Sequence, residues 1–210
     1  MLSPIVRSVR ILQTLVSCSA LCACAGAIDT DNSEQATEEP NVEEQGEALS
    51  LHCAPSVDPA ITVPDGNRVA FTLDASGVQI YACQATASGY GWVFQAPEAT
   101  LYGLFGRAVG KHYAGPTWEA KDGSKVVGTK LAAVTPDASA IPWLLLQATG
   151  HDGNGKMTDV TFIQRLNTVG GLAPNASTCA AGNVGEVARI DYTATYYFYE
   201  AGKAGCCKSH

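Results

Sequence analysis

The sequence is poor in charged residues. Only 16% of its 210 residues are Asp, Glu, Lys or Arg, and the 13 basic residues are outnumbered by 20 acidic ones. The deficit of basic residues excludes a protein that binds nucleic acid through a positively charged surface. After the first residues, no window has the apolar period of an amphipathic helix over three turns, which argues against a parallel α/β sheet with crossover helices.

Motifs of catalysis and of cofactor binding are also missing. No G-x-S-x-G or H-E-x-x-H motif and no cysteine–histidine nucleophile pattern occurs. The glycines at 103, 106 and 110 lack the spacing of a dinucleotide-binding turn. The four histidines have no metal-ligand spacing: His52, His112, His151 and His210. We therefore expect no cofactor and no metal, although a catalytic triad can still assemble from distant residues.

The first residues have the pattern of an export signal. Arg7 and Arg10 precede an uncharged run, 11–27, that ends in small residues. This run is shorter than the ~20 apolar residues of a spanning helix, and acidic residues follow it. We predict an export signal over residues 1–27.

Three endings of this signal are compatible with the sequence. Cys18 and Cys24 both follow small residues, as in the bacterial lipobox, whereas Ala27 ends an ordinary cleavage site. We favour lipidation at Cys24, because cleavage there leaves a longer apolar run than cleavage at Cys18. The prediction is a lipoprotein of the outer or cell-envelope membrane that contacts the membrane through its lipid only; cleavage after Ala27 would make it a secreted protein.

The acidic residues are concentrated in one segment. Residues 28–50 hold eight of them and no Lys or Arg, so we expect a disordered linker. Residues 51–210 hold twelve acidic against eleven basic residues, and their length suits a single domain.

Residues 51–210 are predicted to form one all-β domain. Runs that alternate with period two or are rich in β-branched and aromatic residues lie at 68–73, 78–83, 91–96, 99–102, 125–130, 142–148, 160–166 and 188–199. Asp-Gly and Asn-Gly pairs, as at Asp122 and Asp152, favour tight hairpin turns between such runs. We expect a single antiparallel β-sandwich or barrel.

One block carries most of the candidate chemistry. His112, Trp118, Glu119 and Asp122 lie within eleven residues. In the functional interpretation, Trp118 stacks on a sugar or another flat ligand while His112 and Glu119 hydrogen-bond to it. In the architectural interpretation, Gly115–Pro116 is a turn, Trp118 anchors the core and Asp122 begins a hairpin.

Two stretches resemble metal sites, but both lack the ligands that such sites need. The loop from His151 to Lys156 contains the DGNGK pattern of calcium loops, but Gly150 and Thr161 stand where such a loop needs carboxylates. The tail offers Cys206, Cys207 and His210 to copper(I) or zinc, but three ligands make an incomplete site.

Residues 77–199 resemble a secreted bacterial and fungal family known as domain of unknown function 3455. The resemblance is carried by six stretches: GVQIYACQA (77–85), W-x-F-x-APEATL (92–101), VGKHYAGPTWEAKDGSKVVG (109–128), IPWLLLQA (141–148), VTFIQRLNTVGGLAP (160–174) and YTATYYFY (192–199). It implies export and a compact β domain, and it brings no established catalytic residue.

Five cysteines remain after the signal, in an oxidising compartment where disulfides form. Cys83 and Cys179 both fall inside the family-like region, and we predict that they pair. We also predict that Cys53 pairs with Cys206 or Cys207.

These patterns favour an exported, non-catalytic binding or structural module of the cell envelope, with a carbohydrate or small-molecule ligand. The alternative is a secreted hydrolase with a site around His112 and Glu119.

Overall fold

The structure is a computed structural model that describes residues 53–203. The predicted export signal with Cys24, the predicted linker, and the cysteines Cys206 and Cys207 lie outside these residues, so these predictions stay predictions.

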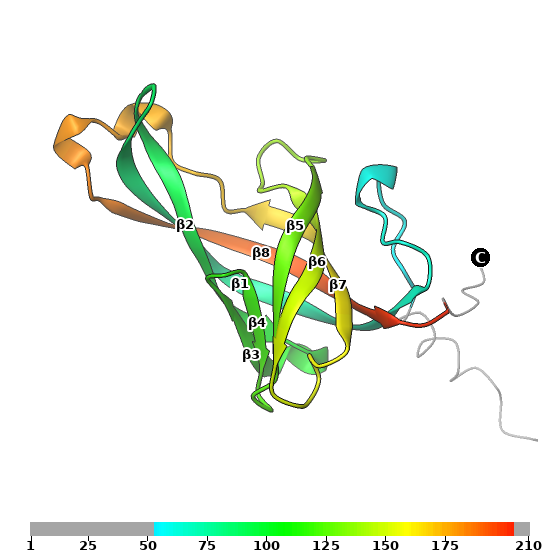
Figure 1. The fold of residues 1–210 in the computed structure, drawn as a ribbon. Coiled ribbons are helices and arrows are strands. Elements are labelled where there is room, and N and C mark those ends of the chain that lie inside the picture. Colours follow the sequence, from blue (N-terminus) through cyan, green and yellow to red (C-terminus); the bar gives the residue numbers. More distant parts are fainter. Residues whose placement is uncertain (1–52, 204–210) are drawn as a thin grey trace, which may run out of the picture. The chain divides into compact units, whose positions relative to one another are not determined.

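Eight antiparallel strands form one sheet that closes into a barrel (Figure 1). The strands are β1 (Asn67–Thr86), β2 (Gly89–Tyr102), β3 (Ala108–Tyr113), β4 (Thr117–Ala120), β5 (Lys125–Val134), β6 (Trp143–Asp152), β7 (Val160–Gly170) and β8 (Val187–Ala201). Each strand pairs with the next along the chain, and β8 pairs with β1. The expected all-β fold is confirmed, as a barrel.

Helical structure within residues 53–203 is limited to short 3-10 turns: η1 (Pro59–Ile61), η2 (Leu104–Gly106), η3 (Ala176–Thr178) and η4 (Ala181–Asn183). None of these is long and apolar enough to cross a membrane.

The core follows from the period-two alternation of the strands. In β8, Tyr192, Ala194, Tyr196 and Phe198 are all buried, whereas Thr193 between them is exposed and Thr195 and Tyr197 are half-buried. Successive side chains of a strand point to opposite faces, so one face of each strand fills the barrel interior. This face supplies the main hydrophobic core.

A second, smaller core lies on the opposite face of the sheet. There Ile61 in η1 packs with Leu145 of β6 and Leu166 of β7. The Gln164 side chain donates a hydrogen bond to the Ile61 carbonyl (2.6 Å) and accepts one from the Tyr199 hydroxyl (2.5 Å). The segment before β1 therefore covers this part of the barrel wall, where β6 and β7 are buried on both faces.

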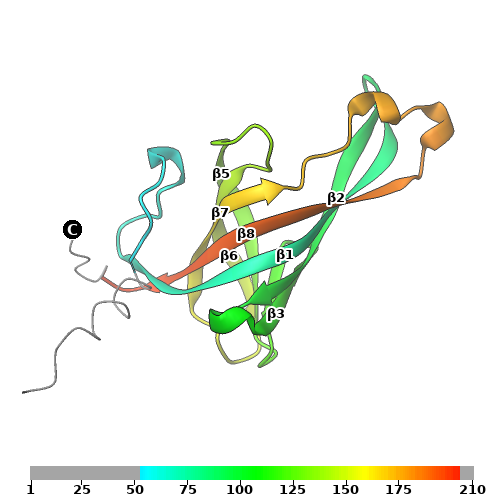
Figure 2. The same cartoon turned by 180° about the vertical axis from the view of Figure 1, so that it is seen from behind.

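Three strands continue beyond the closed part of the barrel. β3 pairs with β2 only from Ala99 to Tyr102, and β7 pairs with β8 no further than Tyr192. Beyond these positions, residues 79–86, 89–97 and 187–190 form a three-stranded ribbon, which we call the arm. Figure 2 shows the segment after β7 running along the arm to its tip.

A disulfide fastens that segment to the arm. Cys83 of β1 is bonded to Cys179, as predicted from the sequence. The Trp92 indole N–H also donates to the Thr178 hydroxyl, at 2.9 Å. Cys53 is disulfide-bonded as well.

The strands are longer than the sequence runs indicated, and the eight predicted runs fall on only six of the eight strands. The runs 68–73 and 78–83 belong to one strand, β1, and the runs 91–96 and 99–102 belong to β2. Strands β3 and β4, of six and four residues, were not predicted. They flank Gly115 in the block that was interpreted as a turn, and they are too short for a clear alternation pattern.

A close approach of backbones at Gly77 yields a test of the barrel wall. A Cβ atom at Gly77 would overlap the Glu98 carbonyl oxygen, whereas one at Gly91 would meet only the Thr86 methyl at 3.8 Å. We expect Gly77→Ala to lower the free energy of unfolding by roughly 3 kcal/mol in urea denaturation, because strand β2 must move. Gly91→Ala is the matched control, with a change below about 1 kcal/mol; equal effects would contradict the register.

Candidate functional site

The barrel interior contains a cavity of about 270 Å³. It is lined by side chains from all eight strands: Gln79 (β1), Phe94, Gln95 and Pro97 (β2), His112 (β3), Trp118 (β4), Lys130 (β5), Leu144 and Leu146 (β6), Arg165 (β7) and Tyr196 (β8), together with Gly115 and Pro116 of the turn between β3 and β4. Its volume is near the lower end of the range for small-molecule sites.

The cavity lies where the arm leaves the barrel. Near this point Gln95 is an extra residue in β2, because Ala96 pairs with Ile80 while Phe94 pairs with the next residue, Tyr81. Bulges and prolines are typical of strand edges, and both Gln95 and Pro97 line the cavity. The departure of β2 from β3 therefore leaves room between Pro97 and the turn at Pro116.

Two predicted site residues, His112 and Trp118, lie together in the cavity wall. They face each other across the β3–β4 pair, and their rings stack with centroids 4.4 Å apart and an interplanar angle of 10°. Gly128 on β5 makes space for the indole, because a Cβ there would lie 3.1 Å from the Trp118 ring. Trp118 is only 1% exposed, so its ring is part of the core and offers no open face for stacking a sugar.

His112 is a buried neutral imidazole. Burial, its largest cause, lowers the pKa of His112 to about 3, and the positive charge of Arg165 acts in the same direction. Its Nδ1 lies 2.9 Å from the Thr117 carbonyl oxygen. A carbonyl only accepts, so Nδ1 carries the proton and Nε2 is a bare acceptor.

Four buried polar atoms of the barrel interior make no hydrogen bond of good geometry within residues 53–203, although the Tyr192 hydroxyl lies close to Gln79 and Tyr196, and Tyr196 lies close to Arg165. They are Gln79 Nε2, Trp118 Nε1, the Tyr192 hydroxyl and the Tyr196 hydroxyl. Gln79, Trp118 and Tyr196 line the cavity itself. An unmade hydrogen bond of this kind costs about 1–3 kcal/mol per group, and such groups in a native interior call for an explanation.

Arg165 brings a positive charge to the same interior. Its Nε and Nη2 donate to the Pro142 carbonyl oxygen at 3.2 and 2.8 Å. Burial is the main cause that raises the pKa of Tyr196, and the nearby Arg165 charge opposes that rise.

Sequence reasoning missed Arg165, Gln79 and Tyr196. One signal was available: Arg165 is the only charged residue in the run 160–166, which is otherwise apolar or neutral. A lone charge inside a strand that is buried on both faces indicates a specific role for that charge.

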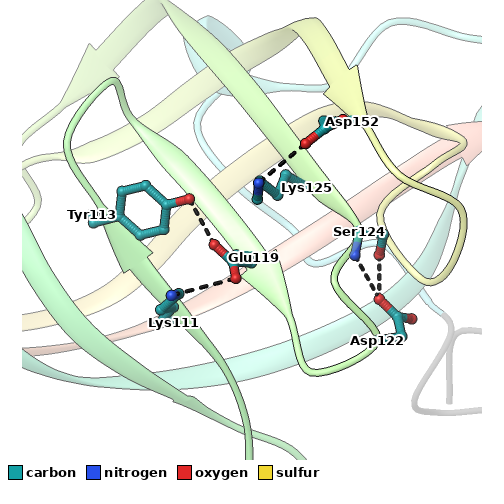
Figure 3. A network of polar contacts seen from close by, with 7 residues as sticks. All are labelled: Lys111, Tyr113, Glu119, Asp122, Ser124, Lys125 and Asp152. Carbon is teal, nitrogen blue, oxygen red and sulfur yellow. Dashed lines mark hydrogen bonds and ion pairs between the residues drawn. The ribbon is translucent and has the colours of Figure 1, made fainter.

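Glu119 lies outside the barrel. It accepts a hydrogen bond from the Tyr113 hydroxyl (2.7 Å) and pairs with Lys111 (3.3 Å), as Figure 3 shows. The hydrogen bond from Tyr113 and the nearby lysines lower the pKa of Glu119. Because residues alternate along β3 and β4, His112 and Glu119 point to opposite faces of the sheet and do not share a site.

Asp122 joins two loops. Its Oδ1 accepts from the backbone N–H and hydroxyl of Ser124 (Figure 3). Its Oδ2 accepts from the Lys156 backbone N–H at 2.8 Å. These hydrogen bonds, of which the one from the Ser124 hydroxyl has the largest effect, lower the pKa of Asp122.

Asp152 of the calcium-like loop forms an ion pair with Lys125 at 3.1 Å. Within residues 53–203 no three His, Cys, Asp or Glu side chains gather as a metal site requires.

The fold and the cavity define an eight-stranded antiparallel barrel with a partly polar interior. The chain belongs to the family described as "Protein of unknown function (DUF3455)", whose family model matches residues 64–200. No curated protein and no solved structure matches it.

The low pKa of His112 yields a prediction for stability against pH. An unfolded histidine, with its pKa near 6.5, takes up a proton that the folded His112 resists down to about pH 3. Stability from this group is therefore complete above pH 6.5 and is lost as pH falls toward 3. Between pH 7 and pH 5 we expect a loss of about 2 kcal/mol in the free energy of unfolding.

Urea denaturation at both pH values measures this loss, and His112→Gln is the control that lacks it. Equal pH dependence in the two proteins would contradict the low pKa of folded His112. An NMR titration of the wild-type protein tests this pKa without any variant. A midpoint near pH 6.5 for the His112 imidazole would also contradict it.

Proposed function

We propose that this protein is an exported, non-catalytic binding module, lipid-anchored at Cys24, whose barrel cavity holds a small molecule. Export and anchoring are supported by the sequence pattern of residues 1–27. The binding function is supported above all by one observation: buried polar groups of Gln79, Trp118 and Tyr196, which make no hydrogen bond of good geometry within residues 53–203, line a preformed cavity. A ligand with complementary polar atoms would remove the cost of leaving these groups without partners.

Binding without turnover is favoured by the chemistry of His112. A general base works best when its pKa is near the operating pH, and a pKa of about 3 makes His112 a weak base. The carboxylate of Glu119 lies on the other face of the sheet, so it cannot orient this imidazole. His112 Nε2 is instead suited to accept one hydrogen bond from a ligand.

A small apolar molecule is favoured over a carbohydrate. The Trp118 ring, which a sugar would need as a platform, is stacked on His112 and buried. The remaining walls are largely apolar, with Phe94, Leu144 and Leu146 facing the cavity. Such walls with a few placed polar groups are typical of small-molecule sites.

A thermal-shift screen of the purified protein against small metabolites tests this function. A ligand at a hundred times its dissociation constant stabilises the fold by about 2.7 kcal/mol, which raises the melting temperature. Leu144→Trp should fill the cavity and abolish the shift. Leu131→Trp, at an exposed position on neighbouring β5, is the matched control and should retain it.

Two outcomes would overturn the proposal. One is a screen in which no compound raises the melting temperature of the wild-type protein, which favours a structural module with water in the cavity. The other is a shift that persists in Leu144→Trp, which would place the ligand elsewhere on the surface.

A further inference from the structure

We infer that the ligand of the barrel cavity is a small carboxylate with an apolar body, and that Arg165 binds its carboxylate group. This inference rests on the proposed function, because it names the class of ligand for the same cavity.

The first support is a half-buried cation without an acidic partner. Arg165 donates to the Pro142 carbonyl, and none of the ion pairs formed within residues 53–203 includes it. Arg68 and Arg189, by contrast, each have an acidic partner, Glu200 and Glu98. A positive charge inside a protein is costly unless a counter-charge accompanies it. A bound anion would supply that counter-charge.

The second support is the charge of the lining as a whole. Lys130 is an exposed cation at the cavity, and no Asp or Glu lines it. The two basic side chains therefore give the cavity a positive potential, which attracts anions and excludes cations.

The third support is the excess of hydrogen-bond donors. The indole N–H of Trp118 can only donate, and the guanidinium of Arg165 can only donate. The Gln79 amide nitrogen can donate as well, and the Tyr196 hydroxyl, which lies close to Arg165 and Tyr192, can donate or accept. The side-chain acceptors of the lining are His112 Nε2 and the amide oxygens of Gln79 and Gln95, which are fewer than the donors. A ligand that presents two acceptor oxygens fits this set better than a hydroxyl-rich one.

The size and the walls of the cavity select a carboxylate on an apolar body. A volume of about 270 Å³ with Phe94, Pro97 and Leu146 in its walls suits one ring or a short chain. The planar guanidinium of Arg165 matches the planar carboxylate with two parallel hydrogen bonds. A phosphate carries more charge than these apolar walls accommodate without further donors.

Paired ligands test this inference by calorimetric titration of the purified protein. The panel consists of 3-phenylpropionate, cyclohexanecarboxylate and hexanoate, each with its neutral amide, and phenyl phosphate. We expect at least one carboxylate to bind about tenfold or more tightly than its amide, since charge-assisted hydrogen bonds are the strong ones. A preference of the wild-type protein for the amides, or for phenyl phosphate, would overturn the inference.

Variants locate the effect at Arg165. Arg165→Gln should weaken carboxylate binding about tenfold and leave amide binding within about threefold, whereas Arg165→Lys should restore part of the affinity. Arg68→Gln is the matched control, because it removes a positive charge from the surface pair with Glu200. It should change neither carboxylate binding nor amide binding. Equal weakening of acid and amide in Arg165→Gln would contradict the role of Arg165. If Arg165→Gln does not fold, the test is the affinity of the wild-type protein for each carboxylate compared with its amide.

The panel separates this inference from the function on which it rests. If the amides bind as tightly as the acids, the cavity is still a small-molecule site, but the inference of a carboxylate ligand is wrong. If no member of the panel binds, and the metabolite screen is also without effect, both the inference and the proposed function fall.

Discussion

The pairing of β8 with β1 is the constraint on which the rest of the structure depends. This ladder runs from Asn67 with Ala201 to Ala82 with Val187, and it closes the sheet into a barrel. Closure gives every strand one inward face, and the inward side chains must then fill a common interior. Because the same ladder continues past the closed part, it also builds the arm that diverges from β3 and leaves the cavity between them.

That interior is not filled by apolar side chains alone. Trp118 packs edge to face against Tyr196 and Phe198 as in a hydrophobic core. Yet a neutral histidine, an arginine without an acidic partner in residues 53–203 and polar atoms without good hydrogen bonds there share the space. Polar groups inside a barrel lower its stability unless they are satisfied. Their concentration around one cavity, at the place where β2 departs, favours a binding site over a packing defect.

The sequence predicted the fold class because alternation and turn residues are local signals. It also predicted Cys83–Cys179, through the extent of the family-like region. It did not predict β3 and β4, whose few residues are interrupted by the turn at Gly115, nor the continuity of β1 across Gly77. The run of chemistry-bearing residues from His112 to Asp122 suggested one site, but neighbours in a strand point to opposite faces. The structure therefore keeps His112 with Trp118, moves Glu119 outside and places Asp122 in a loop.

The partners that His112 and Trp118 do have come from distant strands. Gln79, Arg165 and Tyr196 lie about 30 to 80 residues away in sequence and meet them only because the sheet closes. No local pattern encodes such a meeting. A lone arginine in the apolar run 160–166 was the one local sign that this strand does more than pack.

The central claim is that a small molecule binds inside the barrel, and the indole N–H of Trp118 reports on it most directly. The protein has three tryptophans, and the Trp92 indole is already hydrogen-bonded to Thr178. In ¹H–¹⁵N spectra recorded during a ligand titration, the account predicts a saturable shift of the Trp118 indole signal while the Trp92 signal stays in place. A ligand that stabilises the protein yet leaves the Trp118 signal unmoved would contradict it.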